Sequence, residues 1–181
     1  MKKIIKSTAF IFIIFLLIPC LGFNQNSEGI DSLNQKLRKA AREIMTAAKT
    51  CALITLDHEG RPRVRAMDPL NPESDFTVWL GTNPKSRKLA QIKKDPGVTL
   101  YYLETKGSGY IMIHGTAQIV NDQKEKEKRW KVEWEPFYPN RSEDLILIKV
   151  SPQWMEVVSY AHGFIGDSET WEPPRVSFDP K

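Results

Sequence analysis

Two groups of basic side chains in the first half of the chain could bind an anion. Arg63 and Arg65 are two residues apart, so on a β-strand both guanidinium groups would point to the same face. Ser86, Arg87 and Lys88 fall where a helix is expected to begin, and a helix start offers unpaired N–H groups and the positive end of the helix dipole. Guanidinium, ammonium and hydroxyl groups together favour phosphate. The spacing therefore indicates a phosphate-binding site, with a solvated basic surface as the alternative interpretation.

Other kinds of catalytic or metal site have no such support. The sequence has no G-x-S-x-G nucleophile elbow, no H-E-x-x-H zinc motif and no glycine-rich phosphate loop of the usual kind. His58, His114 and His162 lie too far apart for metal-ligand spacing. Cys51 is expected to be a buried strand residue, and as the only cysteine after Cys20 it cannot form a disulfide within the mature domain. We therefore assign neither a metal site nor a catalytic residue.

The beginning of the chain has the layout of a secretory signal peptide, which we place at residues 1–23. A lysine-rich start precedes the apolar run 9–18, which is about half as long as the ~20 residues of a membrane span. The run ends in Leu-Ile-Pro-Cys, which resembles a lipobox, so lipidation of Cys20 and simple cleavage both stay open. No Arg-Arg pair precedes the run, so export of an already folded protein is not indicated. We expect a bacterial protein that is exported, either periplasmic or anchored to the membrane as a lipoprotein.

Length and charge limit the remaining possibilities. The chain has 181 residues, of which 41% are hydrophobic and 27% charged, and this composition fits one globular domain. Its formal charge of +4 includes Lys2, Lys3 and Lys6 of the signal peptide, without which 23 basic residues face 22 acidic ones. A nearly neutral mature domain has no bulk electrostatic attraction for nucleic acid, so nucleic-acid binding is set aside.

The elements that must position these side chains are one helix followed by a mostly β domain. Leucine, isoleucine and alanine recur at three- and four-residue steps over 27–49, which is typical of an amphipathic helix. A short helix is expected at 85–94, begun by Asn83 and Pro84. Short apolar stretches bounded by turn residues predict strands at 50–57, 62–67, 76–80, 98–103 and 110–120, and a final hairpin of 145–150 and 154–160. Six or seven strands joined by tight turns favour a small antiparallel barrel, mainly β with helices.

Five stretches in a fixed order resemble the pyridoxamine 5′-phosphate oxidase family, most of all its general stress protein branch. They are PRVRAM (62–67), VWLGT (78–82), NPKSRKLAQI (83–92), DPGVTL (95–100) and GYIMIHGTA (109–117). The resemblance extends from about residue 30 to 160. It implies an FMN-binding split β-barrel over residues 28–165, followed by a C-terminal tail at 166–181. It also implies a homodimer with flavin at the subunit interface.

The same resemblance implies a cofactor site, residue by residue. Arg65 would contact the phosphate or ribityl part of FMN, and Ala66 and Met67 would line the edge of the isoalloxazine. Gly81 and Thr82 would offer backbone and hydroxyl contacts. Ser86, Arg87 and Lys88 would bind the phosphate, and Tyr110 would make a polar contact with the flavin. The C-terminal R-x-H pair that holds the pyridoxal substrate in the true oxidase is missing, so oxidation of vitamin B6 is not expected.

Three hypotheses follow for the function. The first is an exported FMN-dependent oxidoreductase acting on a small molecule, in which the flavin supplies the redox chemistry. The second is a module of the same fold that binds flavin or haem without turnover, with His114 or His162 available as an axial haem ligand. The third is a structural dimer whose cleft no longer binds a cofactor. Trp130, Trp134 and Phe137 are expected to pack a helix onto the barrel or onto a partner subunit, without a catalytic role.

Overall fold

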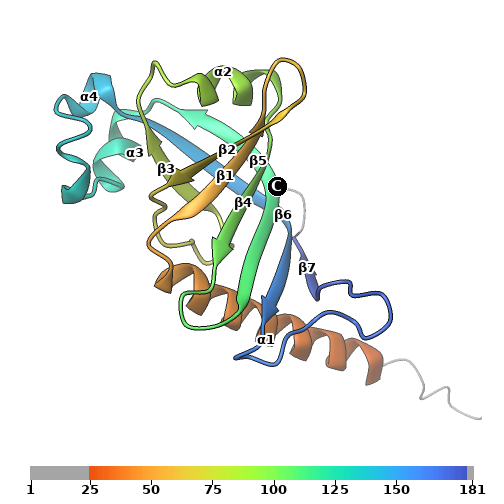
Figure 1. The fold of residues 1–181 in the computed structure, drawn as a ribbon. Helices are drawn as coiled ribbons and strands as arrows, with labels where there is room; N and C mark the ends of the chain where they lie inside the picture. Colours follow the sequence, from red (N-terminus) through yellow and green to blue (C-terminus); the bar gives the residue numbers. More distant parts are fainter. Residues whose placement is uncertain (1–24, 179–181) are drawn as a thin grey trace, which may run out of the picture.

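The computed structural model describes residues 25–178, and their centre is a seven-stranded antiparallel sheet (Figure 1). The predicted signal peptide, with Cys20, lies outside the described residues. The strands are β1 (Cys51–Leu56), β2 (Pro62–Met67), β3 (Val78–Thr82), β4 (Gly97–Leu103), β5 (Gly109–Val120), β6 (Ile146–Ser159) and β7 (Arg175–Ser177). Their order in the sheet is β2-β1-β4-β5-β6-β3, and β7 pairs with β6 beyond the end of β3. The predicted mainly β fold with helices is confirmed.

The sheet closes into a barrel because its two outer strands meet. Just after β2, Pro69 forms a bridge with Leu80 of β3, and the N–H of Leu70 donates to the carbonyl of Trp79 at 2.9 Å. Closure over so short a stretch is the geometry of a split barrel. This closure places the end of β2 beside β3. It therefore brings together the two basic groups that are separated in the sequence.

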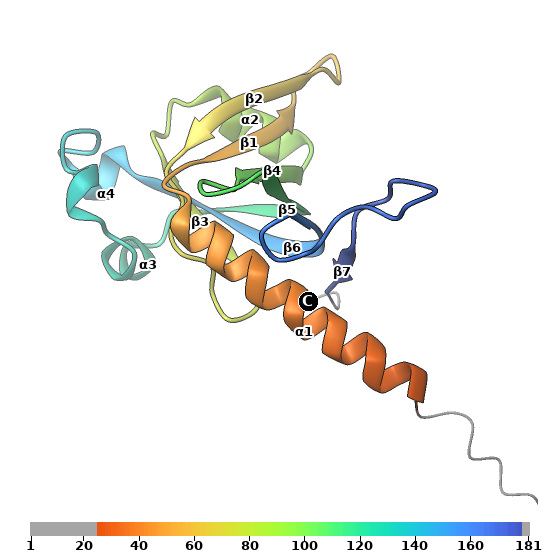
Figure 2. The ribbon, with the colours of Figure 1, turned by 60° about the horizontal axis from the view of Figure 1, so that its bottom comes forward.

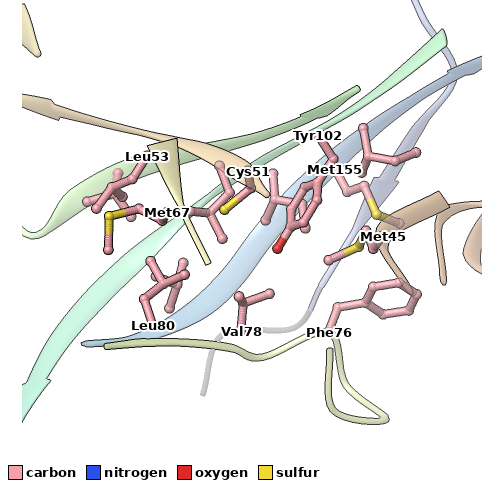
Figure 3. Packing of buried hydrophobic residues seen from close by; sticks show 14 of the residues in the cluster. Met45, Cys51, Leu53, Met67, Phe76, Val78, Leu80, Tyr102 and Met155 are labelled. Atoms are coloured by element: carbon pink, nitrogen blue, oxygen red, sulfur yellow. The ribbon is translucent and has the colours of Figure 1, made fainter. Parts of the chain in front are cut away.

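Side-chain alternation along the strands fills the barrel with apolar groups. Figure 3 shows Cys51 and Tyr102 packed near Met45 and Met155 in this core. Cys51 is 3% exposed, and burial raises the pKa of its thiol to about 12. A thiol that stays protonated is a poor nucleophile. Cys51 is therefore the buried strand residue that the sequence predicts.

Helix α1 (Gln25–Ala47) lies across one end of the barrel (Figures 1 and 2). It buries Leu37, Ala41, Ile44 and Met45 against the core, as the predicted amphipathic pattern requires. The helix extends past the sheet at its N-terminal end (Figure 2). Within residues 25–178, no helix combines the length and apolar character needed to cross a membrane.

The predicted final hairpin around Pro152 is wrong, because residues 146–159 form the single long strand β6. Pro152 lacks an N–H and usually interrupts a central strand. Here it falls between the stretch of β6 that pairs with β3, ending at Val150, and the stretch that pairs with β7, beginning at Trp154. On the other side, β5 shifts its register at Gly115, where a Cβ atom would lie 2.2 Å from the carbonyl oxygen of Ser151. The strand therefore continues through the proline with a bulge beside it.

Residues 121–145 leave the barrel between β5 and β6 and form α3 (Gln123–Lys128), the 3-10 turn η1 (Val132–Trp134) and α4 (Arg141–Asp144). We call this segment the insertion. Trp134 packs with Trp79 and Leu147 in a small cluster separate from the main core, so it does join the insertion to the barrel. The guanidinium of Arg129 lies 3.6 Å from the centroid of the Trp79 ring and adds to this attachment. Farther along, the segment expected as a C-terminal tail contributes β7 to the sheet.

Candidate functional site

Lys88, in the first turn of α2 (Arg87–Lys94), links the two parts of the predicted anion site. Its ammonium group donates to Thr82 Oγ1 at the end of β3 and to Ser86 Oγ, each at 2.8 Å. An ammonium group has three N–H donors. Within residues 25–178 no hydrogen-bond partner takes the third, which leaves it for an anion.

Helix α2 begins two residues later than predicted, and this changes the role of Ser86. The amide oxygen of Asn83 accepts from the N–H of Lys85 at 2.9 Å, and the N–H of Ser86 donates to the Asn83 carbonyl at 3.0 Å. Residues 83–86 therefore form a turn, and the helix starts at Arg87. Ser86 stands at the N-cap without a side-chain capping bond. Its hydroxyl accepts from Lys88 and keeps its own proton to donate to a ligand.

Arg65 is held in place by neutral partners. One of its terminal nitrogens donates to Thr55 Oγ1 at 2.7 Å, and the other donates to Gln91 Oε1 at 2.8 Å. Thr55 in turn donates to Gln91 Oε1 at 2.7 Å, so β1, β2 and α2 share one network. Neighbouring Arg63 instead lies 2.8 Å from the carboxylate of Asp57. Of the two predicted arginines, only Arg65 keeps an uncompensated charge within the described chain.

We call Arg65, Thr82, Ser86, Arg87 and Lys88 the cationic cluster. Burial lowers the pKa of Arg65, and the charges of Arg87 and Arg63 add to this effect. Burial also lowers the pKa of Lys88, with a further contribution from Arg65. In the part of the chain that the structure covers, no carboxylate forms an ion pair with Arg65, Arg87 or Lys88. Like charges gathered without an acid favour the binding of an anion.

A cavity of about 320 Å³ opens beside this cluster, at the edge where β2 and β3 meet. We call it the barrel-edge cavity. It is lined by Ala66, Met67, Asp68, Gly81, Thr82, Lys88, Glu133, Trp134, Phe137 and Tyr138. Five of the nine residues that the family resemblance implied therefore line one space. Arg87 lines a separate hollow of about 240 Å³ with Asp57, His58 and Gln91.

The insertion forms an aromatic wall of the cavity, with Trp134, Phe137 and Tyr138. The indole N–H of Trp134 donates to Asp68 Oδ2 at 2.6 Å, and Lys131 binds the other oxygen of Asp68 at 2.6 Å. A Cβ atom at Gly81 would lie 3.0 Å from the Trp134 ring, so a glycine there allows the indole to lie against β3. Phe137, by contrast, is 71% exposed.

Sequence reasoning missed the role of this wall and of the polar partners of Arg65. The run of aromatics between 130 and 138 was the available signal, but without a regular element it pointed only to packing. Gln91 belongs to one of the matched stretches, yet no role was inferred for it. Its contact with Thr55 depends on α2 lying across β1, which local sequence does not reveal.

Tyr110 lies outside the barrel-edge cavity, on the outer face of β5. It stacks on Tyr101 of β4 with ring centroids 5.1 Å apart, and in the same sheet His114 stacks on Trp154 at 5.3 Å. Burial raises the pKa of Tyr110, and nearby Glu156 contributes. We call this surface the outer sheet face. Its role in holding flavin stays a prediction.

Neither histidine considered as a haem ligand is free of contacts. His114 is stacked on Trp154, and His162 lies 2.8 Å from Ser159 Oγ and 3.1 Å from Glu43. Within residues 25–178, no group of three or more His, Cys, Asp or Glu side chains is arranged to hold a metal ion.

Residues 35–165 match the protein family described as pyridoxamine 5′-phosphate oxidase like. No curated protein sequence shows significant similarity to the chain.

Solved structures share the fold at low sequence identity. General Stress Protein 26 from Bacillus anthracis matches with a TM-score of 0.62 at 20% identity, over 81% of this chain and 98% of that one. A Clostridium acetobutylicum protein related to general stress protein 26 matches with a TM-score of 0.64 at 22% identity, over 80% and 94%. A heme binding protein from Mycobacterium smegmatis matches with a TM-score of 0.56 at 17% identity, over 67% of this chain and 53% of that one.

Proposed function

This chain belongs to the pyridoxamine 5′-phosphate oxidase like family, and from that premise we propose that its barrel-edge cavity binds FMN. We further propose that the protein is an FMN-dependent oxidoreductase that acts on a small molecule other than vitamin B6. The observation that carries the proposal is the pairing of a cationic cluster without ion-paired carboxylates and a cavity with an aromatic wall.

The residues present fit the chemistry of FMN, which joins a phosphate to a planar ring system. Lys88 and Ser86 retain hydrogen-bond donors for a phosphate, and Arg65 adds a positive charge held by neutral groups. Trp134 and Phe137 supply flat apolar surface on the other side of the cavity. A cavity of about 320 Å³ lies within the range of small-molecule sites.

The chain itself would bind, orient and shield the cofactor. Lys88 and Ser86 would hold the phosphate, and the Thr55–Gln91 network would keep the Arg65 guanidinium from turning toward solvent. Trp134, fixed by Asp68, would cover one side of the ring and exclude water. FMN, when bound, supplies electron transfer to and from a small substrate. No described side chain is assigned the transfer of a proton.

A second copy of the chain is proposed as the partner, with flavin near the interface. The outer sheet face carries Val64, Leu103 and the Tyr101–Tyr110 stack, and Val64 and Leu103 are 66% and 65% exposed. Exposed apolar and aromatic groups on a broad sheet are typical of subunit interfaces. A homodimer through this face would bring Tyr110 to the interface, where the family resemblance implies a flavin contact.

We also propose that the protein is exported, because residues 1–23 have the layout of a secretory signal peptide. The mature protein would then acquire its cofactor after crossing the membrane. Haem is the second ligand to test, because a heme binding protein shares the fold and basic groups at a cavity suit haem propionates.

The test is a visible absorption spectrum of the chain from residue 24 onward, taken after incubation with FMN and desalting. A retained flavin spectrum near one FMN per subunit is expected. Arg65→Ala combined with Lys88→Ala should weaken binding at least about a hundredfold, because each charge-assisted contact contributes roughly 1.5–3 kcal/mol. Arg63→Ala combined with Lys85→Ala is the matched control and should bind as the wild type does. Unchanged affinity in the first pair would refute this site, and a colourless wild type would shift the test to haem.

A further inference from the structure

Tyr138 belongs to the aromatic wall of the barrel-edge cavity and has a hydroxyl that is free to bind. The residue lines the cavity beside Trp134, whose ring it meets edge-on with ring centroids 5.9 Å apart. Within residues 25–178 the Tyr138 hydroxyl has no hydrogen-bond partner. It is also not one of the unpartnered polar atoms that are fully enclosed by the protein. A molecule from solvent can therefore reach it.

The local sequence holds Tyr138 in place before any ligand arrives. Phe137 and Tyr138 lie between two prolines, in the run Pro-Phe-Tyr-Pro at 136–139. A proline fixes its own φ angle and restricts the residue before it, so Tyr138 has few backbone conformations to choose from. The N–H groups of Phe137 and Tyr138 both donate to the carbonyl of Trp134 at 3.0 Å. Because Trp134 is itself buried, the Tyr138 ring is positioned relative to the wall, which lowers the cost of binding.

The Tyr138 hydroxyl remains a hydrogen-bond donor at neutral and moderately alkaline pH. Burial raises the pKa of Tyr138, and the negative charge of Asp68 adds to this effect. A phenol ordinarily titrates near about pH 10, so this one keeps its proton well above neutral pH. A protonated phenol donates one hydrogen bond and carries no charge. Its hydrogen therefore needs an acceptor atom on a ligand.

The charges on this side of the cavity select the kind of acceptor. Asp68 and Glu133 line the cavity with Tyr138, and Asp68 is already paired with Lys131. Glu133 forms no ion pair among the described residues, so its charge repels a second anion here. A neutral carbonyl oxygen accepts a hydrogen bond without adding charge. Phe137 offers exposed flat apolar surface next to it, so these features fit a planar compound with a neutral carbonyl group.

Other tyrosines of the barrel do not offer the same contact. The Tyr102 hydroxyl also lacks a described partner, but it is enclosed in the core shown in Figure 3, where no ligand can reach it. Tyr110 lies on the outer sheet face, stacked on Tyr101. Of these four tyrosines, Tyr138 is the one that lines the barrel-edge cavity.

We propose that the Tyr138 hydroxyl is the hydrogen-bond donor that recognises a neutral carbonyl oxygen of a planar ligand in the barrel-edge cavity. The inference rests on the proposed function for the place where the ligand binds. Two sources supply such an oxygen, the ring system of FMN and a separate substrate of the quinone or aromatic ketone class. In both cases Lys88 binds an anion on the cationic side of the cavity, and Tyr138 binds the carbonyl on the aromatic wall.

The test follows carbonyl stretching frequencies, which fall when the oxygen accepts a hydrogen bond. Infrared difference spectra are recorded for the full-length chain with FMN, and then for the FMN-loaded chain with 1-acetylnaphthalene, a planar ketone that serves as the substrate probe. Tyr138→Phe removes the hydroxyl and should fold normally, because that hydroxyl has no described partner to lose. In this variant a ligand carbonyl band should move to higher frequency. The affinity for the same ligand should fall roughly three- to tenfold, as expected for one neutral hydrogen bond.

The band that moves identifies the source of the carbonyl. A shift confined to FMN assigns the hydrogen bond to the cofactor, and a shift confined to 1-acetylnaphthalene assigns it to a substrate. Tyr160→Phe is the matched control, because Tyr160 is 65% exposed and does not line the cavity. It should leave the bands and the affinities of both ligands unchanged.

The proposal is overturned if neither carbonyl band moves in Tyr138→Phe, or if the same band moves equally in Tyr160→Phe. A wild type that retains no FMN would refute the proposed cofactor alone. The spectra of 1-acetylnaphthalene with the unloaded chain then decide the role of Tyr138. A wild type that binds neither ligand would overturn both proposals.

Discussion

The two sides of the barrel-edge cavity differ in how far their polar groups are satisfied. On the aromatic side, Asp68 binds both the Trp134 indole and the Lys131 ammonium group, so the charge of Asp68 is matched within the chain. On the cationic side, Lys88 lines the cavity and Arg65 lies behind the lining, close enough to affect the pKa of Lys88. Both have hydroxyl or amide partners but no ion-paired carboxylate in the described structure. The contacts of Asp68 are therefore complete without a ligand and hold the aromatic wall that shapes the cavity. The other side provides the attraction for an anion.

The largest effect on stability is expected from Trp134→Ala. Trp134 is 4% exposed and packs against Trp79 and Leu147, so its removal leaves a cavity and frees Asp68 from one partner. We expect a loss of about 3–5 kcal/mol in the free energy of unfolding, measured by denaturant titration. Phe137→Ala is the matched control on the same wall, since Phe137 is 71% exposed and should change stability by no more than about 0.5 kcal/mol. Similar losses in both variants would show that the buried Trp134 contributes no more to stability than the exposed Phe137.

A smaller loss of stability is expected from Thr55→Val, at the point where the cationic side meets the core. Thr55 is 1% exposed, accepts from Arg65 and donates to Gln91, so Thr55→Val removes two hydrogen bonds at nearly constant size. We expect the free energy of unfolding to fall by about 1–2 kcal/mol. FMN binding should also weaken, because the Arg65 guanidinium loses an anchor.

Thr116→Val supplies the control for this change. Thr116 is an exposed threonine on β5 whose hydroxyl accepts from Gln153, and its loss should cost no more than about 0.5 kcal/mol. If Thr55→Val lowered the free energy of unfolding as little as Thr116→Val does and left FMN affinity intact, the Thr55–Gln91 network would have no part in positioning Arg65.

The two sides of the cavity also differ in how much of them the sequence can reveal. Arg65 follows from strand alternation, and Ser86, Arg87 and Lys88 follow from a helix start, so each has a local signal. Trp134 has none, because it lies in a 3-10 turn within the insertion and its partner Asp68 is 66 residues away. Contacts of this kind depend on how the insertion folds back over the barrel, and periodicity does not encode that.

Strand boundaries show the same limit. The sequence predicts that Pro152 ends a strand, because a proline has no N–H to donate to a neighbouring strand. Whether that donor is missed depends on which strands lie beside it. In the fold, the pairing of β6 with β3 ends at Val150 and its pairing with β7 begins at Trp154. The missing N–H of Pro152 therefore falls between the two paired stretches. The small barrel and its antiparallel sheet could be predicted, but the continuity of β6 required knowledge of the strands on either side.

The smallest effect is expected from Lys88→Met without ligand. This change removes two hydrogen bonds, each worth about 1 kcal/mol, and also removes a buried charge next to Arg65. The two consequences oppose each other, so the net change in stability at pH 7.5 should stay below about 1 kcal/mol. Added inorganic phosphate should then stabilise the wild type and leave Lys88→Met unchanged.

The pH dependence of the same variant separates an anion site from a structural lysine. Burial, with Arg65, lowers the pKa of Lys88, so the folded chain holds this proton less tightly than the unfolded chain does. The wild type should therefore gain stability relative to Lys88→Met as the pH rises through the lowered pKa toward the ordinary value of lysine, about 10.4. Lys85→Met, at an exposed position in the same turn, should show no such trend. A wild type that instead loses stability relative to Lys88→Met over this range would mean that the charged form is favoured by the fold, and that the cationic side is already satisfied without a ligand.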